Sequence, residues 1–222
     1  MHEKEDRSAM PETLPRGPFR SRRDIVLASA SPRRQELLQR LGLDFLVRIS
    51  DAREPDWTEA TESPEDFVLS AARGKAESVL PSLPHGVVLA ADTVIALDGN
   101  ILGKAGSRDQ ALSILRRLAG RTHTVLTGCC LADKHDQEEA FVVGTDVTMP
   151  ALEESTLRAY VDTGEYEGKA GAYAIQGVGS FLVRGISGSY TNVVGLPLQK
   201  VLFCLQRMNA VETLSEEGHE NV

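Results

Sequence analysis

The chain has 222 residues, of which 41 % are hydrophobic and 25 % are charged, a composition typical of a globular protein with a sizeable core. Its formal net charge of −8 argues against nucleic acid or a membrane surface as a partner, because both attract positively charged faces. Three cysteines, two of them adjacent, predict reduced thiols rather than a disulfide framework, and the first residues contain no apolar signal segment. We therefore expect a cytoplasmic protein.

Both ends of the chain differ in composition from its middle. Residues 1–23 are charged and rich in proline, and the last residues read EEGHENV. Segments with so few large apolar side chains bury too little surface to offset the entropy of ordering. We expect a disordered N-terminal extension over 1–23, a folded domain over 24–209 and an acidic C-terminal tail over 210–222.

Strand-like and helix-like segments alternate along the predicted domain. Expected strands cover 25–28, 45–49, 87–97, 101–102, 122–132 and 140–149, and the Gly-rich stretch 169–184 is expected to form a strand–turn–strand unit. Expected helices begin at the caps Ser31–Pro32, Ser63–Pro64 and Ser107, cover 152–162, and begin for the last time at Pro197. This alternation predicts an α/β protein with a mixed sheet.

The first chemical signal is a pair of arginines at the start of the first expected helix. Arg33 and Arg34 follow Ser29 and Ser31 directly after an apolar strand. Two cations at the positive end of a helix dipole are unfavourable unless an anion binds there, so free N–H groups, hydroxyls and guanidinium groups together predict a polyphosphate site. The alternative is that Ser31 is only an N-cap and that both arginines point to solvent.

The second signal is Asp92, which lies inside the apolar run 87–97. A carboxylate within such a strand is unfavourable unless it is paired, bound to a metal or at the strand end. The structural alternatives are a turn-closing aspartate or a partner of one buried arginine. No turn residues flank Asp92, so the sequence favours a functional role.

Lysines beside glycines form the third signal. Lys75, Lys104 and Lys169 each have such a neighbour, and lysine binds phosphate as a point charge while glycine allows close approach of the backbone. Further along, the amide of Gln176 could read the edge of a base. Each of these features taken alone also fits a solvated charge or an ordinary turn. The sequence contains no Walker A motif, no G-x-G-x-x-G at a helix start, and no His-x-x-His or Cys-x-x-Cys pair.

Together these segments resemble a known family. The stretches LASASPRRQELL (27–38), AADTVIALDG (90–99), KAGAYAIQG (169–177) and GSYTNVVGLPL (188–198) are similar, in order and spacing, to the Maf family of nucleotide pyrophosphatases. The resemblance implies an elongated mixed β-sheet in two lobes around a cleft, related to the inosine triphosphate pyrophosphatases. It also implies a cytosolic homodimer that depends on a divalent metal, Mg²⁺ or Mn²⁺.

The resemblance assigns roles to individual residues. Asp92 matches the catalytic carboxylate, and it would hold the metal together with Glu54. The trio Arg33, Thr93 and Gln176 matches the positions that govern substrate choice, and their identities resemble the branch acting on dTTP and UTP rather than the 7-methyl-GTP branch. The expected phosphate-binding residues are Ser29, Ser31, Arg34, Lys75, Lys104 and Lys169.

The implied reaction is attack of water on the α-phosphate of a nucleoside triphosphate, releasing the monophosphate and pyrophosphate. Two alternatives stay open: a non-catalytic nucleotide-binding regulator of cell division, and a related enzyme that prefers purines. The chain also departs from the family pattern, because Gly74, Gly103 and Gly168 stand where many members carry acids before the corresponding lysines. These departures bear on the metal ligands more than on the class of reaction.

Overall fold

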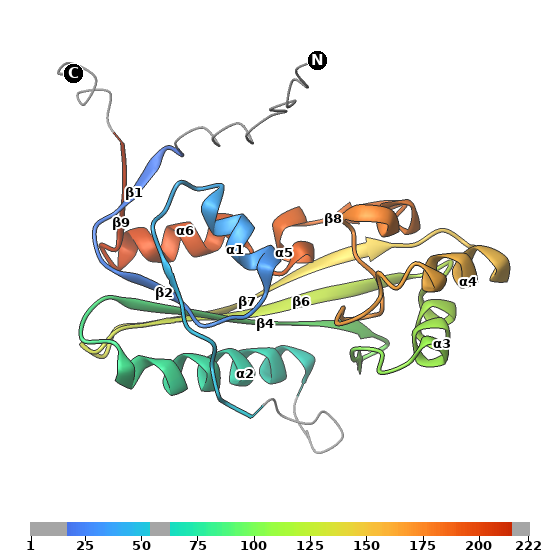
Figure 1. Cartoon of the computed structure of the whole chain (residues 1–222), viewed down its shortest axis with the longest axis horizontal. Coiled ribbons are helices and arrows are strands. Elements are labelled where there is room, and N and C mark those ends of the chain that lie inside the picture. Colours follow the sequence, from blue (N-terminus) through green and yellow to red (C-terminus); the bar gives the residue numbers. More distant parts are fainter. Residues whose placement is uncertain (1–16, 54–62, 215–222) are drawn as a thin grey trace, which may run out of the picture.

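The computed structural model describes residues 17–53 and 63–214, which form an elongated α/β molecule (Figure 1). The strands are β1 (Phe19–Ser21), β2 (Ile25–Leu27), β3 (Leu46–Val47), β4 (Val87–Leu97), β5 (Asn100–Leu102), β6 (Thr122–Ala132), β7 (Glu138–Thr148), β8 (Gly185–Ser187) and β9 (Val211–Thr213). The helices are α1 (Pro32–Gln39), α2 (Pro64–Val79), α3 (Arg108–Leu118), α4 (Glu154–Asp162), α5 (Tyr190–Val194) and α6 (Leu198–Arg207), with 3₁₀ turns η2 (Leu80–Ser82) and η3 (Gly177–Leu182).

The main sheet is mixed and has the strand order β3-β2-β4-β6-β7-β8. Strand β2 is parallel to both β3 and β4, whereas β4, β6 and β7 are long and antiparallel. One edge of β4 changes partner along its length, because it pairs with β2 as far as Leu89 and with β5 from Ile95 onward. Among the described residues no strand covers that edge between these two positions, and Asp92 lies in the gap.

Helices cover both faces of the sheet, α2 on one and α1, α5 and α6 on the other (Figure 1). Helix α2 begins where the sequence predicts, since the Ser63 hydroxyl accepts a hydrogen bond from the N–H of Asp66. Its buried side includes Phe67 and Val68, and the backbone of Val68 lies directly against Gly128 of β6. Only a residue without Cβ permits this approach, so the packing holds Lys75 of α2 close to β4.

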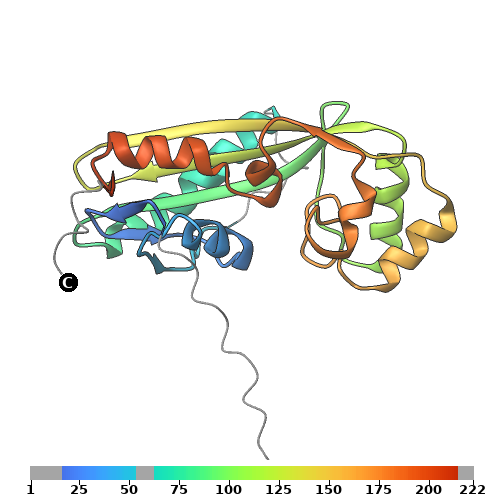
Figure 2. The same ribbon diagram turned by 90° about the horizontal axis from the view of Figure 1, so that it is seen from above.

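A second lobe forms where the long strands extend beyond α2 (Figure 2). There α3 and α4 pack on the far ends of β4, β6 and β7, and their core includes Leu112, Leu115 and Tyr160. A separate core around Leu37, Leu89 and their neighbours joins α1 and α6 to the first lobe. The predicted α/β class, with an elongated mixed sheet in two lobes, is confirmed.

Several predicted elements need correction. The stretch 169–184 is not strand–turn–strand, because left-handed glycines at Gly171 and Gly177 interrupt it and η3 fills its second half. The structure contains only an isolated bridge there, between Ala170 and Lys104. Helix α5 was not predicted, and the strand expected over 45–49 shortens to β3.

Parts of both predicted tails are ordered. Strands β1 and β9 pair antiparallel, within the segments 1–23 and 210–222 that were expected to be disordered. An ion pair between Arg20 and Glu212 crosses them. The folded part therefore includes a two-stranded sheet on both sides of the predicted 24–209 boundary, and residues 1–16 and 215–222 lie outside the described chain.

Candidate active site

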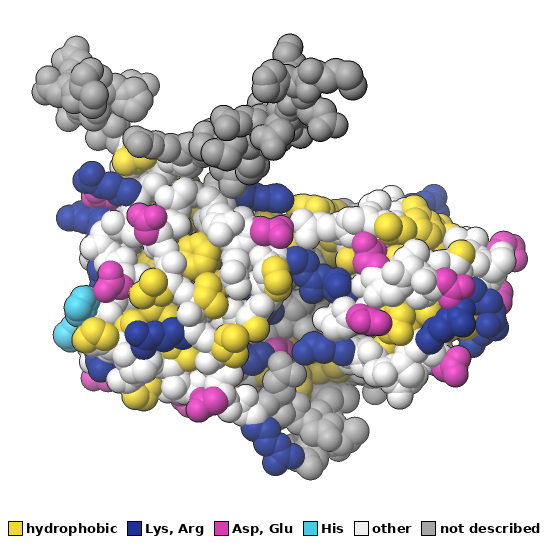
Figure 3. All heavy atoms as spheres, viewed as in Figure 1, with side chains coloured by type: hydrophobic (Ala, Val, Ile, Leu, Met, Phe, Trp, Pro, Cys, Tyr) yellow, Lys and Arg dark blue, Asp and Glu magenta, His cyan; other side chains and the backbone are white. Residues whose placement is uncertain are grey.

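A pocket of about 590 Å³ opens between the two lobes. In the space-filling view, Lys and Arg side chains gather around a hollow near the middle of the molecule (Figure 3). The structure brings ten of the predicted site residues into the lining of this pocket: Ser29, Ser31, Arg33, Arg34, Lys75, Asp92, Thr93, Lys104, Lys169 and Gln176. The eleventh, Glu54, lies outside the described residues.

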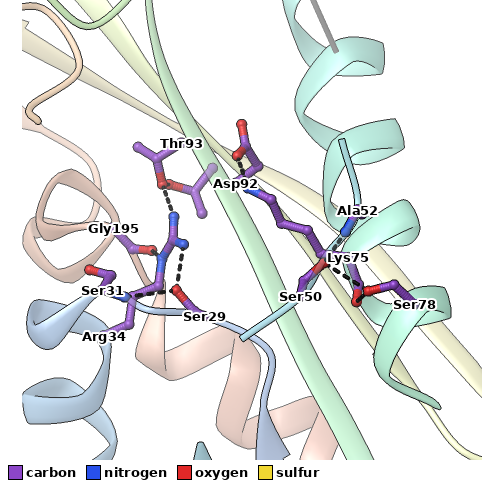
Figure 4. Close-up of polar contacts among 11 residues, drawn as sticks. Ser29, Ser31, Arg34, Ser50, Ala52, Lys75, Ser78, Asp92, Thr93 and Gly195 are labelled. Atoms are coloured by element: carbon purple, nitrogen blue, oxygen red, sulfur yellow. Dashed lines mark hydrogen bonds and ion pairs between the residues drawn. The ribbon is translucent and has the colours of Figure 1, made fainter. Parts of the chain in front are cut away.

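Asp92 lines this pocket, in the stretch of β4 that has no neighbouring strand on one edge among the described residues. Its Oδ1 accepts a hydrogen bond from Lys75 Nζ at 2.6 Å, and the two side chains are 16 % and 13 % exposed (Figure 4). The carboxylate therefore closes no turn, and its partner is a lysine of the same pocket.

Arg34 connects three separate parts of the pocket. Its Nε donates to the carbonyl oxygen of Gly195 at 2.8 Å, Nη1 to Ser29 Oγ at 3.0 Å, and Nη2 to Thr93 Oγ1 at 3.0 Å (Figure 4). The Ser29 hydroxyl also accepts the N–H of Ser31 at 3.2 Å. All three guanidinium nitrogens thus bind protein groups, so Arg34 fixes the geometry of the pocket.

The hydroxyl of Thr93 belongs to a small hydrogen-bond network. Its oxygen accepts from Arg34 Nη2 at 3.0 Å and lies 2.9 Å from Thr127 Oγ1, a contact in which either hydroxyl can donate. Thr127 Oγ1 also lies 3.3 Å from the carbonyl oxygen of Asn192. These contacts fix the position of the Thr93 side chain in the pocket.

Arg33 and Lys169 are cations in a partly desolvated part of the pocket. Burial lowers the pKa of Arg33, and this is opposed by the nearby carboxylates of Glu165 and Glu36. Burial also lowers the pKa of Lys169, as does the charge of Arg33. Burial of a cation is unfavourable unless an anion compensates it, so this part of the pocket is suited to a negatively charged ligand.

The charge of the lining is opposite to that of the whole chain. Among the described lining residues, five are cations (Arg33, Arg34, Lys75, Lys104 and Lys169) and two are carboxylates (Asp92 and Glu167), although the chain carries −8 overall. Such a concentration of positive charge in a cleft attracts polyanions. No group of three or more His, Cys, Asp or Glu side chains suited to a metal occurs within residues 17–53 and 63–214.

Packing does not exclude acids from the three glycine positions that depart from the family pattern. A Cβ added at Gly74, Gly103 or Gly168 would meet no heavy atom within 4 Å. At Gly74 and Gly103 the absence of an acid is therefore a property of this sequence rather than a steric requirement of its fold, whereas Gly168 has a φ of +67°, which disfavours a side chain.

The sequence did not reveal every residue that builds the site. Thr127 and Gly195 hold Thr93 and Arg34 through tertiary contacts. Thr127 lies in no pattern that suggests a function, and Gly195 lies in the stretch 188–198 that resembles the family, but the resemblance assigns it no role. Glu167 lines the pocket as well. Its neighbours in TGEYEGKAG offered a signal, since two acids lie close to a lysine there.

A larger, more open hollow of about 970 Å³ lies away from these residues, beside β1 and β2. Arg23 there donates to Asp133 Oδ2 at 2.8 Å and to the carbonyl oxygen of Gly86 at 3.2 Å. Burial alone would raise the pKa of Asp133, but hydrogen bonds from Arg23 and two backbone N–H groups bring it below its ordinary value. These groups satisfy one another and tie the chain ends to the sheet.

The fold and the pocket together define an α/β protein with a cationic, phosphate-type site around the partly buried carboxylate of Asp92. The model of the Maf-like protein family matches residues 24–208, so the chain belongs to the Maf family. No helix within the described residues is both long enough and apolar enough to cross a membrane.

Similar proteins cover most of the chain. A protein of Nitratidesulfovibrio vulgaris named dTTP/UTP pyrophosphatase is 49 % identical over 195 residues, which is 88 % of this chain and 92 % of the relative. One of the same name from Myxococcus xanthus is 49 % identical over 183 residues, or 82 % and 91 % of the two chains. A crystal structure of a nucleoside-triphosphatase / dITP/XTP pyrophosphatase from Mycobacterium abscessus aligns with a TM-score of 0.41 at 16 % identity, covering 84 % of this chain and 96 % of that one, a likeness too low to support a conclusion.

Proposed function

We propose that this protein hydrolyses dTTP and UTP to the nucleoside monophosphate and pyrophosphate. The observation that carries the proposal is the carboxylate of Asp92, held by a lysine within a pocket lined by five cations. A nucleoside triphosphate needs cations around its phosphates, because phosphoryl-transfer catalysis depends mainly on positioning and on stabilising charge. The proteins named dTTP/UTP pyrophosphatase, which are 49 % identical to this chain over 195 and 183 aligned residues, support the choice of substrate.

In this proposal Asp92 accepts the proton of the water that attacks the α-phosphorus. Lys75 holds the carboxylate in place and, with Lys104, neutralises the phosphate chain. The N-terminus of α1, with Ser29 and Ser31 beside it, supplies N–H and hydroxyl donors to the pyrophosphate that leaves.

The donors present fit a divalent cation that arrives with the nucleotide. Mg²⁺ is commonly bound by one or two carboxylates together with substrate phosphates and waters, so Asp92 suffices as the main protein ligand. A cation of this kind, Mg²⁺ or Mn²⁺, would neutralise phosphate charge and lower the pKa of bound water. Glu54 is the second ligand that we expect.

Thr93 and Gln176 are proposed to read the base, with Arg33 beside them. Uracil and thymine present an N3–H donor, whereas N3 of cytosine is an acceptor. Thr93 and Gln176 each carry an acceptor oxygen that complements the N3–H of the first two bases. The name dTTP/UTP pyrophosphatase of the similar proteins supports a preference for these two bases over CTP.

The experiment that tests this function is a panel of nucleoside triphosphates with Mg²⁺, scored for monophosphate and pyrophosphate. We expect turnover of dTTP and UTP, little of CTP, ITP or 7-methyl-GTP, and loss of about 10²- to 10⁴-fold in kcat for Asp92→Asn. Tight nucleotide binding without turnover under any divalent metal would instead favour a non-catalytic regulator. Preferential turnover of ITP would keep the reaction and overturn the base assignment.

The cytoplasmic location and the homodimer remain predictions. Size-exclusion chromatography with light scattering tests the second of these directly, since a single peak at twice the 24.1 kDa chain mass is expected.

A further inference from the structure

The short segment that carries Gln176 is held at both ends by α4 and the turn after it. At its far end, Glu165 Oε1 accepts the N–H of Val178 at 2.9 Å and Oε2 accepts the N–H of Gly179 at 2.7 Å. At its near end, the hydroxyl of Tyr160 accepts the N–H of Ala174 at 3.3 Å. That hydroxyl also donates to Glu165 Oε2 at 3.0 Å, so one connected network spans residues 174–179.

Two glycines allow the segment to close over this carboxylate. Gly177 has a φ of +79°, and a Cβ there would overlap Glu165 Oε1. A Cβ on Gly179 would lie 2.5 Å from the carbonyl oxygen of Ala174 and 2.9 Å from the Tyr160 hydroxyl. The turn therefore has the shape that two N–H groups need to reach Glu165, and a side chain at either glycine would push it away.

Glu165 does not line the pocket, but its charge reaches residues that do. Its carboxylate raises the pKa of Arg33 against the lowering effect of burial, and it acts on Lys169 in the same sense. Arg33 and Gln176 both line the pocket and both belong to the trio proposed to choose the substrate. Glu165 thus contacts the backbone next to Gln176 and acts electrostatically on Arg33.

We propose that Glu165 is a positioning residue for substrate choice, which holds the turn at residues 174–179 so that the Gln176 amide meets the base. The proposal rests on the proposed function, because it assigns Gln176 to the base of dTTP or UTP. It assigns Glu165 no contact with substrate. An acid does this better than an amide, because both carboxylate oxygens accept hydrogen bonds from the two N–H groups.

The test compares Glu165→Gln with wild type in steady-state kinetics on dTTP, UTP and CTP. The glutamine keeps one acceptor oxygen but presents an NH₂ group to the other N–H, so the turn loosens. Since hydrogen bonds to charged groups are strong, we expect KM for dTTP and UTP to rise about tenfold with a smaller change in kcat, and the preference over CTP to fall by a similar factor. Tyr160→Phe removes one hydroxyl from the same network and should give a smaller change in the same direction.

Asp162→Asn is the matched control, because Asp162 is an exposed acid near the end of α4 whose partner is Arg108 at the surface. It should leave KM and base preference unchanged. Unchanged KM and base preference in Glu165→Gln would overturn the proposal, and so would a fall in kcat that follows melting temperature with base preference intact. If Glu165→Gln does not fold, Tyr160→Phe decides by the same readouts. Failure of wild type to turn over dTTP and UTP would instead refute the proposed function itself, and this assignment of Gln176 with it.

Discussion

Arg34 shows how much of the pocket depends on one side chain. The sequence predicts it as a phosphate ligand, whereas the structure shows it joining Ser29, Thr93 and Gly195, which come from three distant segments. A planar guanidinium group makes such a three-way connection because its donors point in fixed directions. Its positive charge still contributes to the field that attracts the triphosphate. Its main task in this account is to set the positions of the groups that touch the substrate.

Replacing Arg34 with lysine should therefore impair the enzyme although the charge is kept. An ammonium group cannot reach all three acceptors, and loss of hydrogen bonds of this kind is expected to lower kcat/KM about 10- to 100-fold. Steady-state kinetics on dTTP measures the effect. Arg40→Lys, at the exposed end of the same helix, is the control and should behave like wild type. Wild-type kcat/KM in Arg34→Lys would show that charge alone is required.

At the scale of elements, the contact between α2 and β6 controls the position of Lys75. Gly128→Ala would drive a Cβ into the backbone of Val68, so α2 must move away from the sheet. We expect a loss of about 1–3 kcal/mol in the free energy of unfolding, with a fall in activity because Lys75 moves from Asp92. Urea unfolding followed by circular dichroism measures the first effect.

Gly74→Ala, a substitution within α2 itself, should have the opposite effect on stability. Gly74 has no heavy atom within 4 Å of an added Cβ, so alanine should stabilise α2 by about 0.5–1 kcal/mol through its better helix propensity. If Gly74→Ala and Gly128→Ala changed the free energy of unfolding by the same amount and sign, the close packing of α2 on β6 would not explain the effect of Gly128→Ala.

The elements differ in how well the sequence predicts them, for physical reasons. Strand β4 matches the expected range 87–97 because a long apolar run rich in β-branched residues has few other solutions. Helix α2 matches at its start because Ser63 and Pro64 act locally. Helix α5 and η3 were missed because they are short and their stability comes from tertiary contacts. The site shows the same division. Its motif residues were predicted, but Thr127 and Glu165 were not, because they hold site residues by contacts between different segments of the chain.

At the scale of the whole molecule, the long sheet buries a histidine beside the core of the second lobe and thereby makes stability depend on pH. His123 of β6 is 2 % exposed, its Nε2 lies 2.7 Å from the Tyr173 hydroxyl, and its Nδ1 has no hydrogen-bond partner among the described residues. Burial lowers the pKa of His123 to about 4, partly opposed by Asp146. The fold therefore keeps this ring neutral.

The direction of the pH effect follows from that shift. Because the folded pKa of His123 lies below the ordinary 6.5, the unfolded chain takes up the proton first as pH falls. The stability present above pH 6.5 should be lost progressively toward pH 4, by up to roughly 3 kcal/mol from this residue. Urea unfolding at a series of pH values should show this loss in wild type and a flatter dependence in His123→Gln. An identical slope in the two proteins would contradict it, and His85→Gln, an exposed histidine, is the control.

The most direct test of the whole account is hydrolysis of dTTP in water enriched in ¹⁸O, with mass spectrometry of both products. Attack on the α-phosphorus beside Asp92 places the label in dTMP and leaves pyrophosphate unlabelled, and Asp92→Asn should slow the appearance of both products together. Label in pyrophosphate, or release of dTDP and inorganic phosphate, would show that water attacks a different phosphorus and would contradict the account.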